Sequence, residues 1–244
     1  MISAFIERTV PSGLKPHRKD NKILVLFLAA SAAILGLLWL SSEVLEGDTF
    51  AIDKAILLAL RTKGNLAVPI GPGWLLEVVR DITALGGETV LTLITIFVVG
   101  FLLAMRKSST AWFVTGAITS GALVGGLLKH LFLRPRPEIV PHLMQATSAS
   151  FPSGHAMNSA IIYLTLATLL ARSLDDQRVR IYLITIAIAV TVAVGISRVY
   201  LGVHWPSDVI AGWSVGALWA AVCSLIGKML QQRQRIEGPS RPPS

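Results

Sequence analysis

The stretch IYLITIAIAVTVAVGIS, residues 181–197, runs for 17 residues without a charged side chain. A helix needs roughly 17–25 apolar residues to cross a hydrocarbon core of about 30 Å, so this run predicts a membrane-spanning helix. The rest of the chain has a similar character, because 53% of its 244 residues are hydrophobic and only 15% are charged. A typical soluble domain has about 25% charged residues. We therefore expect an integral membrane protein.

Further uncharged runs predict an all-α, six-helix membrane bundle that forms one domain, residues 23–229. The six runs are 23–40, 89–105, 108–128, 156–171, 181–197 and 209–227. The first run exceeds the roughly 7–15 apolar residues of a cleavable signal sequence, so we expect a retained anchor. The run at 156–171 is short and reaches span length only if the residues from Pro152 are also helical.

Basic residues are distributed unevenly between the two ends of the predicted spans. With a cytoplasmic N-terminus, 14 of the 22 Lys and Arg residues fall in cytoplasmic segments, namely Arg8, Lys15, Arg18, Lys19, Lys22, Arg106, Lys107, Arg172, Arg178, Arg180, Lys228, Arg233, Arg235 and Arg241. The positive-inside rule then favours a plasma (inner) membrane protein with both termini inside. We expect a cytoplasmic segment at 1–22 and a disordered cytoplasmic tail at 230–244. These loops account for the net charge of +8, so we expect no nucleic-acid partner.

Residues 41–88 form an outer segment that is too polar to cross the membrane. Two apolar-rich stretches, at 50–60 and 74–85, predict short helices lying at the membrane surface. The stretch GNLAVPIGPGW, residues 64–74, contains two Pro and three Gly and predicts a loop. Cys223 is the single cysteine, which excludes an intramolecular disulfide and a multi-cysteine metal site.

Charged residues on the outer side gather at the ends of the third to sixth predicted spans. They occur in KHLFLRPRP (129–137), PSGH (152–155) and SRVYLGVHWPSD (197–208). An ionisable group at membrane depth costs roughly 2.5–3.5 kcal/mol, so this cluster is a functional-site candidate. A transporter would instead carry ionisable groups near the bilayer midplane, and the six runs contain none. The pattern therefore disfavours transport.

The Lys and Arg side chains of this cluster suit an oxyanion such as phosphate, because a planar guanidinium grips pairs of oxygens. Pro152 is a natural first residue of a helix, so the amides of the next three residues would lack intrahelical partners. That arrangement predicts an anion site at Ser153, Gly154 and His155. Gly154 has no side chain to hold a ligand away from the backbone, and Ser153 adds a hydroxyl donor.

Two histidines and a carboxylate supply the remaining chemistry. Pro206 favours a helix start that places His204 just before the helix and Asp208 in its first turn, as in a capping box. A carboxylate on one imidazole nitrogen leaves the other nitrogen free to attack phosphorus. His204 is therefore the expected nucleophile and Asp208 its orienting group. His155 is expected to protonate the departing oxygen and then to deprotonate the water that hydrolyses a phosphohistidine.

Read in order, these segments resemble a three-part signature. The segments are Lys129, six residues and Arg136-Pro137; then Pro152-Ser153-Gly154-His155; then Ser197-Arg198, five residues, His204, three residues and Asp208. This pattern resembles the type 2 phosphatidic acid phosphatase superfamily, which includes membrane lipid phosphatases, glucose-6-phosphatase and vanadium haloperoxidases. The resemblance covers residues 129–208 directly, and the six-span layout is similar to that of the bacterial membrane members.

The resemblance implies a metal-independent phosphatase without a cofactor, built on the helical core shared with the haloperoxidases. It also implies that Lys129, Arg136 and Arg198 bind the phosphate, with Ser153 and Gly154 beside them. No signature position departs from the pattern.

A site at the outer helix ends predicts a lipid phosphate or diphosphate substrate, because the lipid tail can remain in hydrocarbon. The first choice is undecaprenyl diphosphate, followed by phosphatidylglycerophosphate, phosphatidic acid and diacylglycerol pyrophosphate. Arg134 lies outside the signature and is expected to meet the inner phosphate of a diphosphate. A lipid phosphotransferase and a non-catalytic lipid-phosphate-binding protein are the alternatives. Membrane lipids are the expected surroundings, and the sequence points to no obligate protein partner.

Overall fold

The computed structural model describes residue 36, residues 51–233 and residues 235 and 236. The predicted segment 1–22, the predicted first span apart from residue 36, and most of the tail at 230–244 lie outside the described residues. The helix that precedes the tail continues past the predicted boundary at 229 and ends at Gln232. Within the described residues, the chain is helical except for one two-stranded hairpin and its connecting loops.

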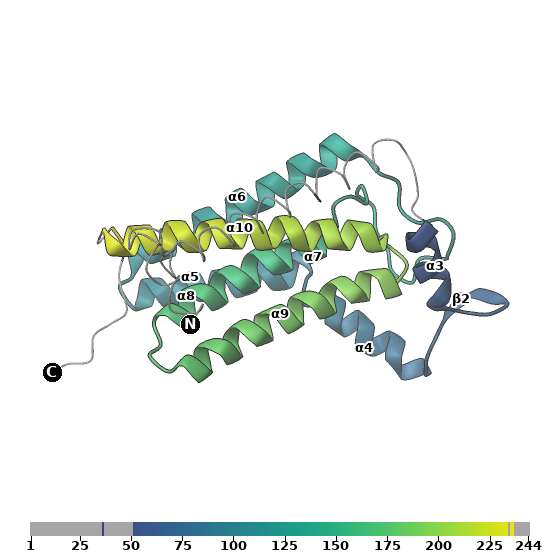
Figure 1. The fold of residues 1–244 in the computed structure, drawn as a ribbon, viewed down its shortest axis with the longest axis horizontal. Helices are drawn as coiled ribbons and strands as arrows, with labels where there is room; N and C mark the ends of the chain where they lie inside the picture. The colour runs from purple at the N-terminus through teal and green to yellow at the C-terminus, as the bar shows by residue number, and fades with distance from the viewer. Residues whose placement is uncertain (1–35, 37–50, 234, 237–244) are drawn as a thin grey trace, which may run out of the picture. The chain divides into compact units, whose positions relative to one another are not determined.

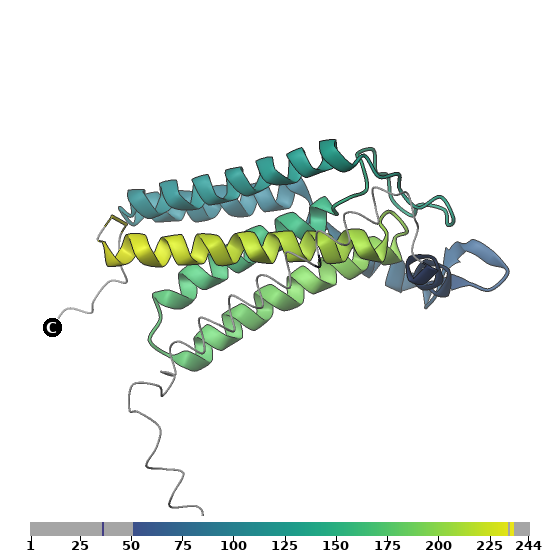
Figure 2. The ribbon, with the colours of Figure 1, turned by 45° about the horizontal axis from the view of Figure 1, so that its top comes forward.

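The elements are, in chain order, α3 (Ala51–Ala59), β1 (Arg61–Thr62), β2 (Asn65–Pro69), α4 (Gly73–Ala84), α5 (Glu88–Ala104), α6 (Ser108–Phe132), α7 (Gly154–Ser159), the π-helical turn η1 (Ala160–Leu164), α8 (Thr165–Arg172), α9 (Gln177–Tyr200) and α10 (Pro206–Gln232). Figures 1 and 2 show the long helices lying lengthwise beside one another, with α3 and the hairpin at one end. We call this end the site end.

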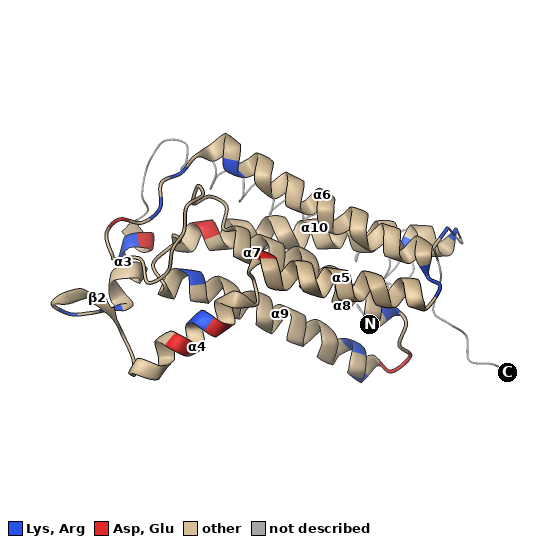
Figure 3. Cartoon of the chain, turned by 180° about the vertical axis from the view of Figure 1, so that it is seen from behind, with Lys and Arg blue, Asp and Glu red and all other residues tan. Residues whose placement is uncertain are grey.

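Among the described residues, four helical segments are long and apolar enough to cross a membrane. They are Ser108–Phe132, Gly154–Arg172, Gln177–Tyr200 and Pro206–Gln232. The helices α4 and α5 pass the same test together, as a pair bent by 45°. Charged residues lie towards the ends of α5, α6, α9 and α10, whereas α4 carries charged residues along its middle (Figure 3). The described residues thus contain helices at five of the six predicted spans.

The short run at 156–171 is lengthened in the way the sequence requires. The helix begins at Gly154, and α7, η1 and α8 together make a span of 19 residues. The polar start of this helix is therefore part of the bundle. Its first turn lies at the site end, between α9 and α10.

The predicted outer segment, residues 41–88, contains helices at the two predicted stretches, α3 and α4. The loop prediction for residues 64–74 is wrong in part. Residues Asn65–Pro69 form β2, which pairs antiparallel with β1. Gly64 has φ 88°, a left-handed conformation that glycine adopts without strain, and it turns the chain between the strands. Arg61 fixes the hairpin to the bundle, because its Nη1 donates to the Tyr200 carbonyl at 2.9 Å.

Two glycines of α10 let the start of α7 approach it closely. A Cβ atom at Gly212 would lie 2.7 Å from the carbonyl oxygen of Ser153, and one at Gly216 would lie 2.5 Å from that of Met157. Small residues allow this close backbone approach between membrane helices. The contact fixes the relative position of the two helix starts that carry the predicted site.

Candidate active site

The site end brings together the predicted residues from five segments of the chain. Lys129 comes from the end of α6, Arg136 from the following loop, Arg198 from the end of α9, and His204 from the turn before α10. The start of α7 lies among them, since His155 interacts electrostatically with all four of these residues. The three sequence segments therefore lie together at the site end.

His204 is held from both sides of its ring. Its Nδ1 lies 3.4 Å from Asp208 Oδ2, and its Nε2 lies 3.2 Å from Arg136 Nη1. A carboxylate only accepts hydrogen bonds, so this pairing places the imidazole proton on Nδ1 and leaves a lone pair on Nε2. Burial lowers the pKa of His204 to about 4, with Asp208 acting in the opposite direction. The ring is therefore neutral at neutral pH.

Asp208 is fully buried, and both of its carboxylate oxygens are occupied. Its Oδ2 accepts the Trp205 backbone N–H at 3.0 Å and the Ser150 hydroxyl, while its Oδ1 accepts Arg134 Nη1 at 2.6 Å. The bond to Trp205 closes the predicted capping box at the start of α10. These contacts leave Asp208 a single orientation, in which Oδ2 faces His204.

The expected role of Arg134 at the inner phosphate of a diphosphate is wrong. Its side chain is 6% exposed and is committed to Asp208 and Asp53. The ring of Trp205 lies 5.5 Å from its guanidinium carbon. Surrounded by these partners, Arg134 faces the orienting carboxylate and has no free edge for a phosphate.

Three cations and an unpaired hydroxyl remain beside the histidines. Ser148 accepts hydrogen bonds from Lys129 Nζ at 3.0 Å and, through its backbone oxygen, from Arg136 Nε at 2.8 Å. Arg198 is buried and donates from Nη1 to Thr83 at 3.1 Å. Among the described residues, Ser153 Oγ and Arg198 Nε are buried without a hydrogen-bond partner. Buried donors without partners are rare, so these two atoms fit an oxyanion ligand.

The start of α7 differs in one respect from the prediction. Ser153 is the N-cap and Gly154 the first helical residue, so the helix begins two residues after Pro152. The amide of Ser153 donates to the Asp208 carbonyl at 3.0 Å and is not free for a ligand. The amides of Gly154 and His155 belong to the first turn, which an α-helix leaves without intrahelical acceptors. The predicted anion site thus has two backbone donors rather than three.

Gly154 also makes room for a cation. A Cβ atom there would lie 3.1 Å from Lys129 Nζ, closer than side chains normally pack. The absence of a side chain lets the ammonium group approach the helix start. Lys129 and the two free amides can therefore act on the same anion.

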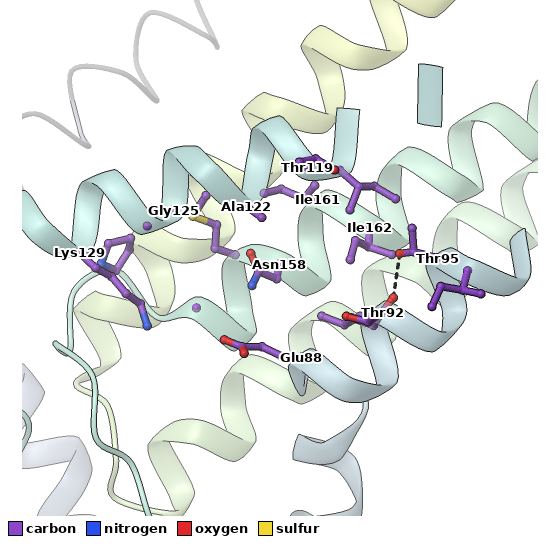
Figure 4. Close-up of a pocket in the computed structure, with 17 residues that line it drawn as sticks. Glu88, Thr92, Thr95, Thr119, Ala122, Gly125, Lys129, Asn158, Ile161 and Ile162 are labelled. Carbon is purple, nitrogen blue, oxygen red and sulfur yellow. Dashed lines mark hydrogen bonds between the residues drawn. The ribbon is translucent and has the colours of Figure 1, made fainter. Parts of the chain in front are cut away.

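A cavity of about 490 Å³ opens beside this site, between α5, α6 and the α7–η1 helix. Lys129, Glu88 and Asn158 lie towards one end, while apolar side chains such as Ile161 and Ile162 line the other together with threonines (Figure 4). Lys129 and Gly154, two of the predicted phosphate-binding residues, line the cavity. The cavity is thus charged next to the candidate site, and uncharged and mainly apolar within the bundle.

Some of the contributing residues were not singled out from the sequence. Ser148 and Ser150 stand just before PSGH, and their hydroxyl groups next to a candidate motif were the available signal. The sequence did not indicate a role for Asp53, because this residue lies 81 positions before Arg134 and contacts it only in the folded chain. Among the described residues, no group of three or more His, Cys, Asp or Glu side chains could hold a metal ion.

Comparison with known proteins gives consistent matches. The family model described as the PAP2 superfamily matches residues 110–232. Phosphatidylglycerophosphatase B of Bacillus subtilis (strain 168) is 37% identical over 203 residues, which are 82% of this chain and 90% of that protein. An undecaprenyl-diphosphatase of Sulfolobus acidocaldarius is 42% identical over 79 residues, 32% of this chain and 34% of that protein.

A solved structure shows the same architecture. The crystal structure of a transmembrane PAP2 type phosphatidylglycerolphosphate phosphatase from Bacillus subtilis superposes with a TM-score of 0.72 at 30% sequence identity. The match covers 82% of this chain and 96% of that one.

Proposed function

Because this chain belongs to the PAP2 superfamily and is a multi-pass membrane lipid phosphatase, we propose that it removes the terminal phosphate of a lipid phosphomonoester, with phosphatidylglycerophosphate as the first substrate. One observation carries the proposal: Lys129 and Gly154, which the proposal assigns to phosphate binding, line a cavity that is uncharged and mainly apolar within the bundle. The phosphate of a lipid can then bind at Lys129 and Gly154 while its hydrocarbon tail occupies the adjoining cavity.

Two observations support a phosphomonoester. The relative that aligns over 82% of this chain is named for phosphatidylglycerophosphate hydrolysis. Arg134, the cation expected to meet a second phosphate, is buried against carboxylates. Undecaprenyl diphosphate is the second candidate, because a relative matching 32% of the chain is named for it. Phosphatidic acid and diacylglycerol pyrophosphate follow.

The phosphate is held by charge and by directed donors. Lys129, Arg136 and Arg198 neutralise its oxygens, while the Ser153 hydroxyl and the amides of Gly154 and His155 supply hydrogen bonds. A phosphoryl group spreads negative charge over its equatorial oxygens as it transfers, so fixed donors stabilise the transition state more than the ground state. Asp208 does not bind the phosphate and acts only on the nucleophile, His204.

The reaction proceeds in two displacements. His204 Nε2 attacks phosphorus, the bond to the lipid oxygen breaks, and His155 donates a proton to that oxygen. The negative charge of the bound phosphate is the electrostatic partner of a protonated His155. In the second step His155 takes a proton from water, the water oxygen bonds to phosphorus, and the phosphohistidine bond breaks. The products are the lipid with a free hydroxyl group on its headgroup and inorganic phosphate.

We propose that the site faces outward from the plasma membrane, with both termini inside. Several basic residues cluster at the helix ends opposite the site end, namely Arg106, Lys107, Arg172, Arg178, Arg180 and Lys228. Positive charge favours the cytoplasmic side, so the site end faces outward. A substrate would then enter from the outer leaflet.

The decisive experiment combines a substrate panel with trapping of the intermediate. Purified protein in detergent is given phosphatidylglycerophosphate, phosphatidic acid, diacylglycerol pyrophosphate, undecaprenyl diphosphate and glucose 6-phosphate, and released phosphate is measured. A radiolabelled phosphoryl group should remain on the protein under alkaline quench and be lost in acid. His204→Ala should abolish both signals, whereas the exposed His130→Ala should keep them.

Three results would contradict parts of the proposal. Preference for glucose 6-phosphate would exclude a lipid substrate. Transfer of phosphate to a lipid alcohol in place of release would favour the phosphotransferase. Normal turnover by His204→Ala would remove the nucleophile assignment.

A further inference from the structure

A buried chain of polar groups runs behind Asp208, on the side away from His204. Arg134 Nη1 donates to Asp208 Oδ1 at 2.6 Å and to Ser207 Oγ at 2.8 Å. Its Nη2 lies 3.4 Å from Asp53 Oδ2. Asp53 in turn accepts the Ser207 backbone N–H at 3.0 Å and the Ser207 hydroxyl. The surface helix α3 is thereby connected to the first turn of α10.

All three charged members of the chain are buried. Asp53 is 3% exposed, Arg134 is 7% exposed and Asp208 is fully covered. The desolvation penalty of burying two charges is about as large as the electrostatic attraction gained between them. A protein with well-packed apolar side chains in place of a buried ion pair is often at least as stable. Stability alone is therefore a weak reason for this arrangement. Arg134 contacts Asp208, and Asp208 contacts His204, so the position of this arrangement next to the predicted nucleophile indicates a use in catalysis.

The geometry shows what that use is. A carboxylate can rotate about its terminal bond, and only one orientation aims Oδ2 at His204 Nδ1. The bond from Arg134 to Oδ1 fixes this orientation from the opposite edge of the Asp208 carboxylate. Asp53 and the ring of Trp205 hold the guanidinium in turn. In the described part of the chain, the polar partners of the Asp53 and Arg134 side chains are one another, Ser207 and Asp208.

We propose that Asp53 and Arg134 are positioning residues for the reaction, so that α3 belongs to the catalytic machinery. Asp53 holds Arg134, and Arg134 holds the carboxylate that orients the nucleophile. This inference rests on the proposed function, because it assigns the nucleophile to His204. It makes a specific kinetic claim: loss of either residue lowers kcat and leaves KM unchanged, since the phosphate site is intact.

The primary test is Asp53→Asn, which keeps the side-chain volume and an acceptor for the Ser207 amide but removes the charge facing Arg134. Hydrogen-bond partners that orient metal-binding histidines change activity by about 10–100-fold when they are mutated. We expect a fall in kcat of that size, with KM changed by less than about twofold. Arg134→Lys should retain more activity than Arg134→Gln, because it keeps the charge.

Two control variants separate positioning from folding. Val114→Ala removes a buried apolar side chain of α6 far from the site end and should lower the unfolding temperature while kcat stays near wild type. Lys54→Gln removes an exposed charge next to Asp53 and should change neither quantity. If Asp53→Asn behaves like Val114→Ala, the role of Asp53 is structural and the inference fails. A raised KM with unchanged kcat would also overturn it.

Vanadate gives a readout that does not depend on lipid turnover. It takes the five-coordinate shape of the transferring group and bonds to the nucleophilic nitrogen, whereas inorganic phosphate occupies the site without that bond. Asp53→Asn should therefore weaken vanadate binding by about tenfold, as transition-state mimics report catalytic geometry, and leave phosphate binding unchanged. Thermal shift measures both affinities. Equal vanadate affinities for the variant and the wild type would refute the inference, even if no lipid in the panel is hydrolysed.

Discussion

The substitution Asp208→Asn keeps the size of the side chain and replaces one acceptor oxygen with a donating amide. Asp208 Oδ1 faces the guanidinium of Arg134, and Oδ2 faces the Trp205 N–H, the Ser150 hydroxyl and His204 Nδ1. Asparagine has one oxygen, so one of these two sides must place a donor against a donor. The consequence for activity depends on which side the amide takes.

Magnitudes decide between the two orientations. The ion pair with Arg134 is lost in both orientations, because asparagine carries no charge. An amide facing Arg134 also leaves the buried guanidinium without this acceptor, which costs more than the roughly 1–3 kcal/mol of an unsatisfied neutral group. An amide facing His204 leaves the Trp205 N–H without an acceptor, which costs about 1–3 kcal/mol, while the hydroxyl and the imidazole can exchange donor and acceptor roles. The second orientation is cheaper. It moves the imidazole proton to Nε2 and removes the lone pair that attacks phosphorus.

We therefore expect a large loss of kcat. The corresponding change in a Ser-His-Asp triad lowers kcat about 10⁴-fold, which corresponds to about 5.5 kcal/mol of activation free energy. The assay is initial-rate phosphate release from phosphatidylglycerophosphate, with quantification of the phosphohistidine. Asp81→Asn removes an exposed carboxylate from α4 and should leave kcat unchanged. A folded Asp208→Asn protein with kcat within tenfold of wild type would refute the tautomer argument.

The remaining predictions concern packing, protonation, metal independence and topology. Gly216→Leu should lower the unfolding temperature, because its Cβ would lie 2.5 Å from a carbonyl oxygen of α7 and overpacking costs about 1–3 kcal/mol, whereas Gly100→Ala has open space and should not. Burial holds the pKa of His204 at about 4 in the folded protein, against 6.5 for a histidine in water. The unfolded chain therefore binds more protons between these values, and stability should fall as pH decreases through this window. His204→Asn should flatten that decrease in a series of thermal melts; an unchanged slope would contradict the assignment. Turnover should survive chelators and be inhibited by vanadate, and recovery of a lost activity by a divalent cation would show a metal requirement. Single cysteines introduced at the exposed positions Gln145 and Ser108 of a cysteine-free chain should react with an impermeant thiol reagent on intact cells only at Gln145, and the reverse labelling would place the site inside.

Local patterns account for much of the architecture. Uncharged runs predicted five helices that the described residues contain, because a backbone in hydrocarbon must satisfy its hydrogen bonds within a helix. The capping box at Asp208 was also predictable, since a proline and a carboxylate at fixed spacing determine the start of a helix. The hairpin was not, because strand pairing at 61–69 depends on a turn at Gly64 and on anchoring by Arg61.

The histidine-carboxylate pair followed from the sequence because Pro206 indicates where the helix begins. A helix start there puts His204 just before α10 and Asp208 in its first turn, so the local chain brings the two side chains together. The signature segments likewise indicated a phosphate site, and the family membership agrees with that chemistry. The individual catalytic and binding roles remain predictions for the experiments above.

Only the tertiary structure decided where the other polar groups go. Arg134 and Arg136 were both expected to bind phosphate, yet Arg134 is buried between carboxylates and Arg136 reaches His204. The pairing of Arg134 with Asp53 joins residues 81 positions apart, and the cavity is assembled from three separate helices. Sequence spacing determines neighbours within about one helical turn, whereas contacts between distant segments depend on how whole helices pack.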